Sequence, residues 1–139
     1  PLSFEKVNGP VKGKQIFSPK TAQQMRLMME TVTQPGGTAT LARIAGYRVA
    51  GKTGTAHKLE GGRYVNRYLS DFIGFAPVSN PRVIVAVMID EPSAGGHFAG
   101  TVAAPAFAAI TASVLRSMNV APDSNITNII PEASVQESM

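Results

Sequence analysis

A lysine with glycine and threonine neighbours is the most chemically suggestive feature of the sequence. The eight residues from Gly46 to Thr53 match G-x-x-x-x-G-K-[ST], the pattern in which backbone N–H groups cradle the phosphates of a nucleotide. That mechanism needs a strand before the loop and a helix that begins at the lysine. Here the interior of the pattern, 47–50, is bulky and strand-like, and no helical pattern follows Thr53. A P-loop nucleotide-binding protein is therefore an alternative that the flanking sequence disfavours.

The same lysine can instead lie on a β-strand together with the residues that follow it. Side chains alternate between the faces of a strand, so Thr53 and Thr55 share one face and their hydroxyls can meet one carboxylate. Lys52 adds a cation for a nucleophile or an anionic substrate. Gly54 permits the close approach of another backbone, and the N–H of Thr55 can donate to a developing oxyanion. An extended peptide can pair along such a strand, which predicts a peptide-binding or acyl-transfer site.

A helix is predicted upstream of this strand. Ser18-Pro19 is a typical helix start, with a capping hydroxyl followed by proline at the first position. Apolar residues then recur at helical spacing, which predicts a stripe that faces the core. The stripe consists of Ala22, Met25, Met29 and Val32. Glycine and proline at 34–37 end the helix.

Three strands are predicted next, from about Tyr47 to Lys58, Arg67 to Phe75 and Arg82 to Asp90. The turns between them lie at Gly61-Gly62 and at 77–81. The third strand is apolar on both faces, which is typical of a central strand in a covered sheet. No later strand is predicted to pair with its far edge. We therefore expect a fragment whose missing strands lie upstream, unless the N-terminal arm pairs there.

A loop at 93–100 and a helix from about Val102 to Met118 complete the predicted elements. The predicted fold class is thus α+β: a helix, a three-strand antiparallel meander and a helix. The chain divides into an irregular arm (1–17), the domain part (18–119) and a flexible C-terminal tail (120–139).

The composition excludes several classes of protein. Of the 139 residues, 44% are apolar and 16% are charged, which excludes a disordered chain, and the absence of cysteine excludes a disulfide framework. The net charge of +4 comes from scattered cations, so no nucleic-acid partner is expected. His57 and His97 are expected at the surface and form no metal-ligand spacing, so no metal and no cofactor is expected. The longest apolar run, 83–89, is too short to span a membrane.

Short motifs follow one another in a fixed order within roughly residues 16–122. They are MME (28–30), PGGT (35–38), GYRVAGKTGTA (46–56), GRY (62–64), FIGFAP (72–77), NPR (80–82), IDEP (89–92), AAPAF (103–107) and LRSMN (115–119). This series resembles the C-terminal part of the class B penicillin-binding proteins, specifically the cell-division (septal, FtsI-type) peptidoglycan D,D-transpeptidases. Lys52-Thr53-Gly54 corresponds to the third motif of that family, K-T-G.

The resemblance implies a five-stranded antiparallel sheet with helices on both faces, and K-T-G on an edge strand beside the active-site cleft. It also implies the reaction: a serine attacks the D-Ala-D-Ala bond of a stem peptide and passes the acyl group to a neighbouring stem. β-Lactams acylate the same serine. The resemblance implies that Lys52 is catalytic, beside the serine of the second motif. Substrate binding falls to Thr53, Gly54, Thr55, Tyr68 and Phe98. His97 stands where relatives often have tyrosine.

The family's other two motifs have no convincing match. Ser3 to Lys6 fits S-x-x-K in an arm without helical pattern, and Ser117 to Asn119 fits S-x-N but follows K-T-G. We therefore expect the chain alone to be inactive and to supply one wall of a site. Its expected partners are the upstream remainder of the domain, stem peptides, β-lactams and, for the parent protein, divisome proteins. The parent is expected on the periplasmic face of the inner membrane, anchored by a segment outside this chain. A non-catalytic peptide-binding module remains an alternative.

Overall fold

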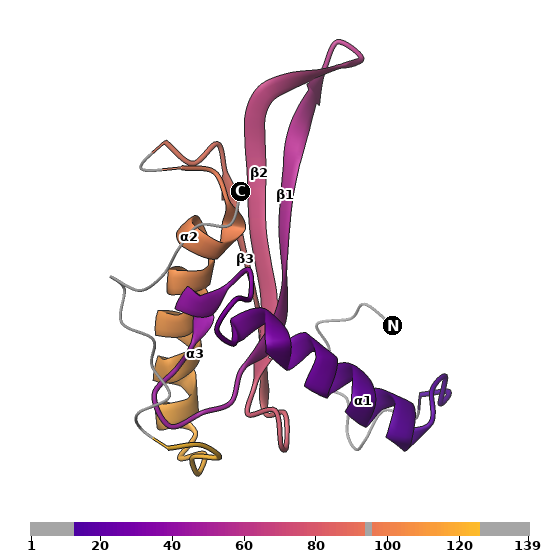
Figure 1. The fold of residues 1–139 in the computed structure, drawn as a ribbon, viewed down its shortest axis with the longest axis vertical. Coiled ribbons are helices and arrows are strands. Elements are labelled where there is room, and N and C mark those ends of the chain that lie inside the picture. The colour runs from indigo at the N-terminus through magenta and orange to yellow at the C-terminus, as the bar shows by residue number, and fades with distance from the viewer. Residues whose placement is uncertain (1–12, 94–95, 126–139) are drawn as a thin grey trace, which may run out of the picture.

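The computed structural model describes residues 13–93 and 96–125. Its centre is an antiparallel sheet in the order β1-β2-β3, formed by β1 (Ala50–Glu60), β2 (Arg63–Ala76) and β3 (Val83–Asp90). Helix α3 (Ala104–Ser117) packs along one face of the sheet, preceded by the short α2 (Ala99–Val102), as Figure 1 shows. The predicted fold class of helix, three-strand meander and helix is confirmed.

Strand β2 starts four residues earlier than predicted. The turn at Gly61 and Gly62 has positive φ at both residues, 54° and 76°. Such a two-residue turn has a backbone twist that matches the flanking strands, so pairing continues to the turn. Glu60 therefore pairs with Arg63, and the hairpin is longer than apolar alternation alone suggests.

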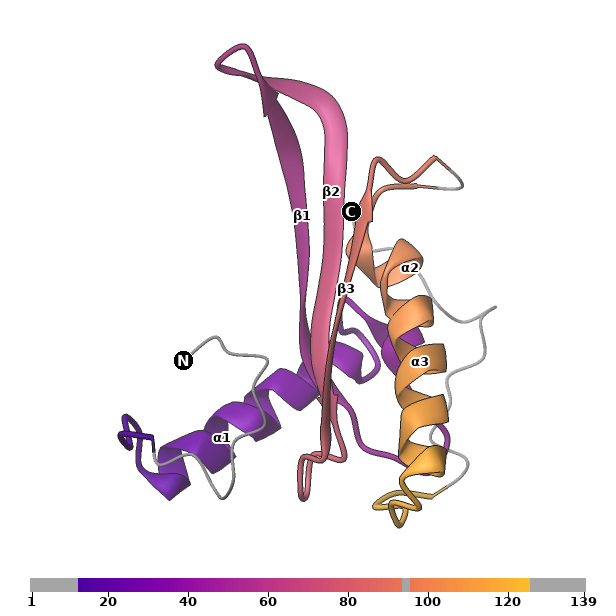
Figure 2. The same cartoon turned by 180° about the vertical axis from the view of Figure 1, so that it is seen from behind.

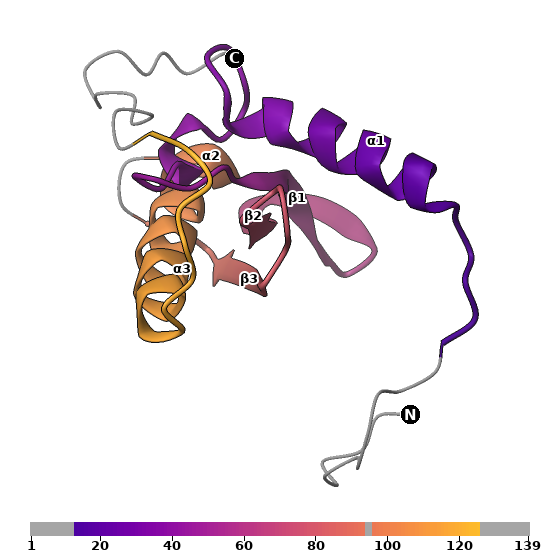
Figure 3. The same cartoon turned by 90° about the horizontal axis from the view of Figure 1, so that it is seen from below.

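Helix α1 (Pro19–Glu30) begins as predicted, because the Ser18 side chain accepts a hydrogen bond from the Thr21 N–H (3.1 Å). The prediction that its apolar stripe faces a core is wrong for the stripe residues within α1, since α1 buries no residue and Met25 is 48% exposed. The reason is its position: α1 lies beside β1 and extends away from the sheet, whereas α3 covers the sheet (Figure 3). The last stripe residue, Val32, follows α1 and is partly buried against the core.

The core lies between the sheet and α3. The rings of Phe72 on β2 and Phe107 on α3 meet edge to face, with centroids 4.8 Å apart. Space for the two rings comes from two glycines: a Cβ at Gly74 would lie 2.8 Å from the Phe107 ring, and one at Gly51 would lie 2.5 Å from the Phe72 ring. The segment Ala99–Ser117 is long and apolar enough to cross a membrane by composition. Its residues Phe107 and Leu115 are fully buried in the core.

Strand β3 differs from its prediction as a strand buried on both faces. Its side chains alternate between partly buried and exposed. The exposed face carries Ile84 (75% exposed) and Met88 (68%), next to Ile73 of β2 (50%). Within the described residues, no element covers this face and no strand pairs with the far edge of β3. The unpaired edge agrees with the expectation of a fragment.

The described residues after α3 return to the loop before β1. The Tyr47 hydroxyl donates to the Val120 carbonyl (2.6 Å), and the Arg48 N–H donates to the Asp123 carboxylate (2.7 Å). This is the first part of the segment predicted as a flexible tail. Residues 126–139 of that tail, and residues 1–12 of the predicted arm with Ser3, lie outside the described residues.

Candidate active site

The K-T-G motif lies on β1, which is one of the two outer strands of the described sheet. No helix begins at Lys52, because strand structure continues from Ala50 to Glu60. A phosphate-binding loop needs the N–H groups of a helix start at this point. The P-loop alternative is therefore wrong, although the motif matches it letter for letter.

The two motif threonines share one face of β1, as predicted. Thr53 pairs with Phe72 and Thr55 pairs with Ser70, both on the face of the sheet that α2 and α3 cover. The Thr53 hydroxyl lies 3.1 Å from the Thr38 hydroxyl. The Thr55 hydroxyl accepts a hydrogen bond from the Ala99 N–H (3.2 Å). Each hydroxyl is therefore oriented by a segment distant in sequence.

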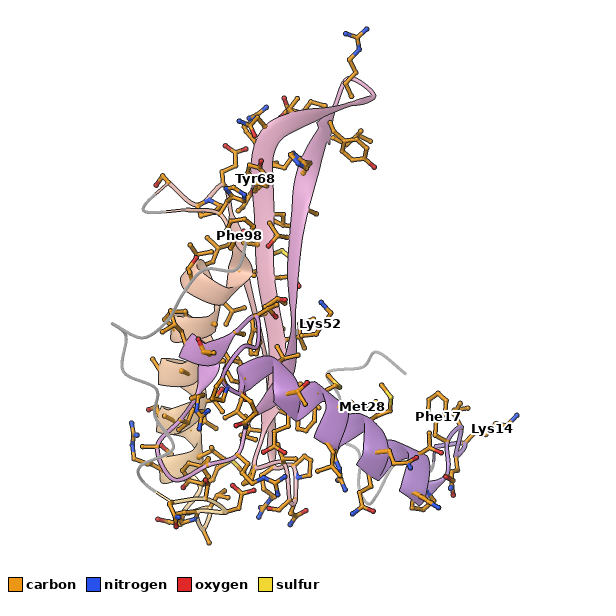
Figure 4. The ribbon with its side chains drawn as sticks, in the orientation of Figure 1. Lys14, Phe17, Met28, Lys52, Tyr68 and Phe98 are labelled. Atoms are coloured by element: carbon orange, nitrogen blue, oxygen red, sulfur yellow. The ribbon has the colours of Figure 1, made fainter. Side chains whose placement is uncertain are left out.

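Lys52 and Gly54 alternate with the threonines and pair with Ile73 and Asp71. Lys52 is exposed, and its ammonium donates to the Thr53 carbonyl (2.7 Å). Figure 4 shows its side chain pointing away from α3. Gly54 was predicted to allow the approach of another backbone, but a Cβ there would lie 2.5 Å from the Asp71 carboxylate. The absent side chain thus makes room for a side chain of β2.

The predicted aromatic residues gather above the motif, on the same face as the threonines. The Tyr68 ring stacks on the His97 ring with centroids 3.8 Å apart and an interplanar angle of 12°. His97 in turn contacts Phe98, with ring centroids 4.5 Å apart. Figure 4 shows Tyr68 and Phe98 on the same part of the molecule. His97 is thus a partly buried link between the two predicted residues, and its expected place as an exposed loop residue is wrong.

Three residues that touch the site were missed at the level of sequence: Thr38, Ser70 and Ala99. Ser70 is fully buried, and its hydroxyl donates to the His97 carbonyl. Their hydrogen bonds span 15, 27 and 44 positions. The sequence held no signal for them, because an isolated threonine, serine or alanine has no distinctive pattern.

Charges gather on the hairpin above the aromatic rings. Lys58 pairs with Asp90 (2.9 Å) and with Glu91 (2.7 Å), and Arg67 pairs with Glu91 (3.2 Å). The hydrogen bond with Glu91 raises the pKa of Lys58, and the same bond lowers the pKa of Glu91. Within residues 13–93 and 96–125, no group of three His, Asp or Glu side chains could hold a metal ion.

Residues 1–112 match the family of the penicillin-binding protein transpeptidase domain. The chain belongs to this family. It is 48% identical to the probable peptidoglycan D,D-transpeptidase PenA of Neisseria gonorrhoeae, over 91% of this chain and 22% of that protein. It is 46% identical to the peptidoglycan D,D-transpeptidase FtsI of Escherichia coli K12, again over 91% of this chain and 22% of the relative.

A solved structure agrees with this family. The transpeptidase domain of penicillin-binding protein 3 from Burkholderia pseudomallei superposes with a TM-score of 0.78 at 48% identity. The match covers 86% of this chain and 37% of that domain structure. The chain thus corresponds to a part of a transpeptidase domain and to about a fifth of the curated relatives that it matches.

Proposed function

We propose that this chain supplies one wall of the active site of a peptidoglycan D,D-transpeptidase that acts in septal cell-wall synthesis. The observation that carries the proposal is the paired, oriented hydroxyls of Thr53 and Thr55 on an outer strand that also presents Lys52. Because β1 is an outer strand of the described sheet, groups on both of its faces border the same open edge. An extended peptide has main-chain partners along that edge.

Each residue has a chemical task in this reaction. Thr53 and Thr55 hold the terminal carboxylate of a D-Ala-D-Ala stem peptide, or the carboxylate of a β-lactam, through their hydroxyls. The backbone N–H of Thr55 donates to the oxyanion that develops when the scissile carbonyl is attacked. Lys52 places a cation beside the attacking group and assists proton transfer. Tyr68 and Phe98 flank the ligand with aromatic surface.

The nucleophilic serine is proposed to lie in the upstream remainder of the domain. The S-x-x-K match at Ser3 lies outside the described residues, and Ser117 ends helix α3. The chain alone is therefore proposed to be inactive. The relatives named as D,D-transpeptidases support a periplasmic, membrane-anchored parent protein with divisome partners.

Intact-mass spectrometry after incubation with benzylpenicillin tests this function. The complete protein that contains this chain is expected to gain one penicilloyl group on an upstream serine, and this chain alone is expected to gain none. Reversible binding of a stem peptide without any adduct would instead favour a non-catalytic peptide-binding module. An adduct on this chain alone would show that the nucleophile lies within it.

Variants then assign the residues. Lys52→Ala is expected to slow acylation about a hundredfold or more, because a positioned acid or base contributes about that factor. Thr55→Val is expected to slow it about tenfold to a hundredfold through loss of a hydrogen bond to a charged group. Thr111→Val is the matched control, since Thr111 is a buried hydroxyl on α3 without a hydrogen-bond partner. Equal acylation rates in all three variants would show that β1 is not part of the active site.

A further inference from the structure

The segment from His97 to Ala99 lies against the face of the sheet that carries Thr55 and Ser70. It is attached at two points, two residues apart. The Ser70 hydroxyl donates to the His97 carbonyl, and the Ala99 N–H donates to the Thr55 hydroxyl (3.2 Å). Ser70 and Thr55 are themselves a cross-strand pair of β2 and β1. The cross-strand pair of Thr55 and Ser70 therefore holds both ends of the segment from His97 to Ala99.

This attachment decides what the Thr55 hydroxyl can do. A hydroxyl has one proton and two lone pairs, whereas a backbone N–H can only donate. Because Ala99 occupies a lone pair of Thr55, the proton of Thr55 remains available to an acceptor such as a carboxylate. If the segment moved away, the hydroxyl would be free to turn its proton to a nearby backbone carbonyl, as threonine side chains often do.

Ser70 is the group that keeps the segment in place. Its side chain is 0% exposed, so its hydroxyl cannot exchange the His97 carbonyl for bulk water. The stacking of the His97 ring on Tyr68, two residues before Ser70 on the same face of β2, supports the same position of the segment. Alanine at position 70 would leave the stack in place and remove only the hydrogen bond.

We propose that Ser70 is a positioning residue that, through His97 and Ala99, keeps the Thr55 hydroxyl oriented as a donor to the substrate carboxylate. The proposal rests on the proposed transpeptidase function and adds a residue that never touches the substrate. It also gives His97 a main-chain role that a different side chain at position 97 would preserve.

The test compares two acylating agents on the complete protein that contains this chain. Benzylpenicillin carries the carboxylate, and its methyl ester does not. Ser70→Ala is expected to weaken the noncovalent binding constant for the acid about fivefold to tenfold and to leave the acylation step within about twofold. Reaction with the ester is expected to be unchanged. Thr111→Val, which removes a buried hydroxyl of α3 that has no hydrogen-bond partner, is the control and is expected to change neither reaction.

A double-mutant cycle shows whether Ser70 acts through Thr55. In a Thr55→Val background the Ser70→Ala substitution is expected to have no further effect, since coupled residues are not additive. Ser70→Cys retains a weak donor and is expected to fall between wild type and Ser70→Ala. It also provides a second variant if Ser70→Ala does not fold. Equal losses with the acid and the ester, or full additivity, would reduce Ser70 to a structural role and overturn the proposal.

Hydrogen exchange of the Ala99 amide separates this proposal from the proposed function. Faster exchange in Ser70→Ala than in wild type is expected, whatever the protein's activity. An unchanged Ala99 amide would overturn the positioning role even if benzylpenicillin acylates the protein normally. Absence of any adduct in wild type would instead overturn the transpeptidase function, and with it the carboxylate as the acceptor.

Discussion

The two halves of the β1–β2 hairpin are held by different forces. The proximal half, 50–55 with 70–76, is part of the core: Ala50, Phe72 and Ala76 are 0% exposed. The distal half, 56–69, extends past the body of the molecule (Figure 2). There the cross-strand neighbours Leu59 and Tyr64 are 63% and 78% exposed. In this half, ion pairs of Lys58 and Arg67 with acidic residues and the stacking of Tyr68 on His97 take the place of a buried core.

The candidate site lies at the boundary between these halves. Thr53 and Thr55 are the last motif residues opposite buried positions of β2, and the aromatic rings begin two residues further along. The motif hydroxyls therefore lie where the buried part of the hairpin ends and its exposed part begins. Substitutions in the proximal half should therefore change the free energy of unfolding. Substitutions in the distal half should change mainly the local protection of the hairpin.

The largest effect is expected from the centre of the proximal half. Phe72→Ala removes the ring that meets Phe107 and leaves a cavity, so the free energy of unfolding should fall by about 3–5 kcal/mol. Urea unfolding of the complete domain measures it. Leu59→Ala in the distal half is the matched change, and because Leu59 is mostly exposed it should cost within about 0.5 kcal/mol. Similar losses of unfolding free energy for both variants would contradict the difference in packing between the two halves.

Substitutions of one glycine in each half are expected to lower the free energy of unfolding by intermediate amounts. Gly74→Ala places a Cβ 2.8 Å from the Phe107 ring and 2.9 Å from the Ala50 carbonyl. Overpacking of this kind should cost about 1–3 kcal/mol and change the near-UV circular dichroism of the core. Gly62→Ala meets no atom within 4 Å but has φ +76°. It should cost about 1 kcal/mol through backbone strain alone, without a spectral change in the core.

The smallest effect concerns the charges of the distal half. Because Glu91 has a lowered pKa in the folded protein, its contribution is complete above the ordinary value of 4.5 and is lost as pH falls through the lowered pKa. Lys58, whose pKa is raised, contributes below 10.5 and loses that contribution as pH rises through the raised pKa. Amide protection around 58–67 should therefore weaken at both extremes of pH and in Lys58→Met. High salt should also weaken it. Protection that depends on neither pH nor salt would show that the pairs are unimportant.

Local patterns in the sequence determined several features of this protein. Strand alternation placed Thr53 and Thr55 on one face, Ser18-Pro19 started α1, and Gly61-Gly62 turned the hairpin. Each of these depends on residues within a few positions of one another, so the backbone geometry of a single element suffices to predict it. The ordered motifs around Lys52 also indicated the family that the comparisons show.

Tertiary structure alone decided how the hydroxyls of the site are oriented and which apolar faces are covered. Thr38 reaches Thr53, and Ala99 reaches Thr55, only because separate segments pack on the same face of the sheet. The stripe residues within α1 are not buried although their spacing is that of a core helix, because the helix lies beside β1 and not over the sheet. Periodicity reports which side of an element is apolar. What that side meets depends on contacts between residues far apart in the chain.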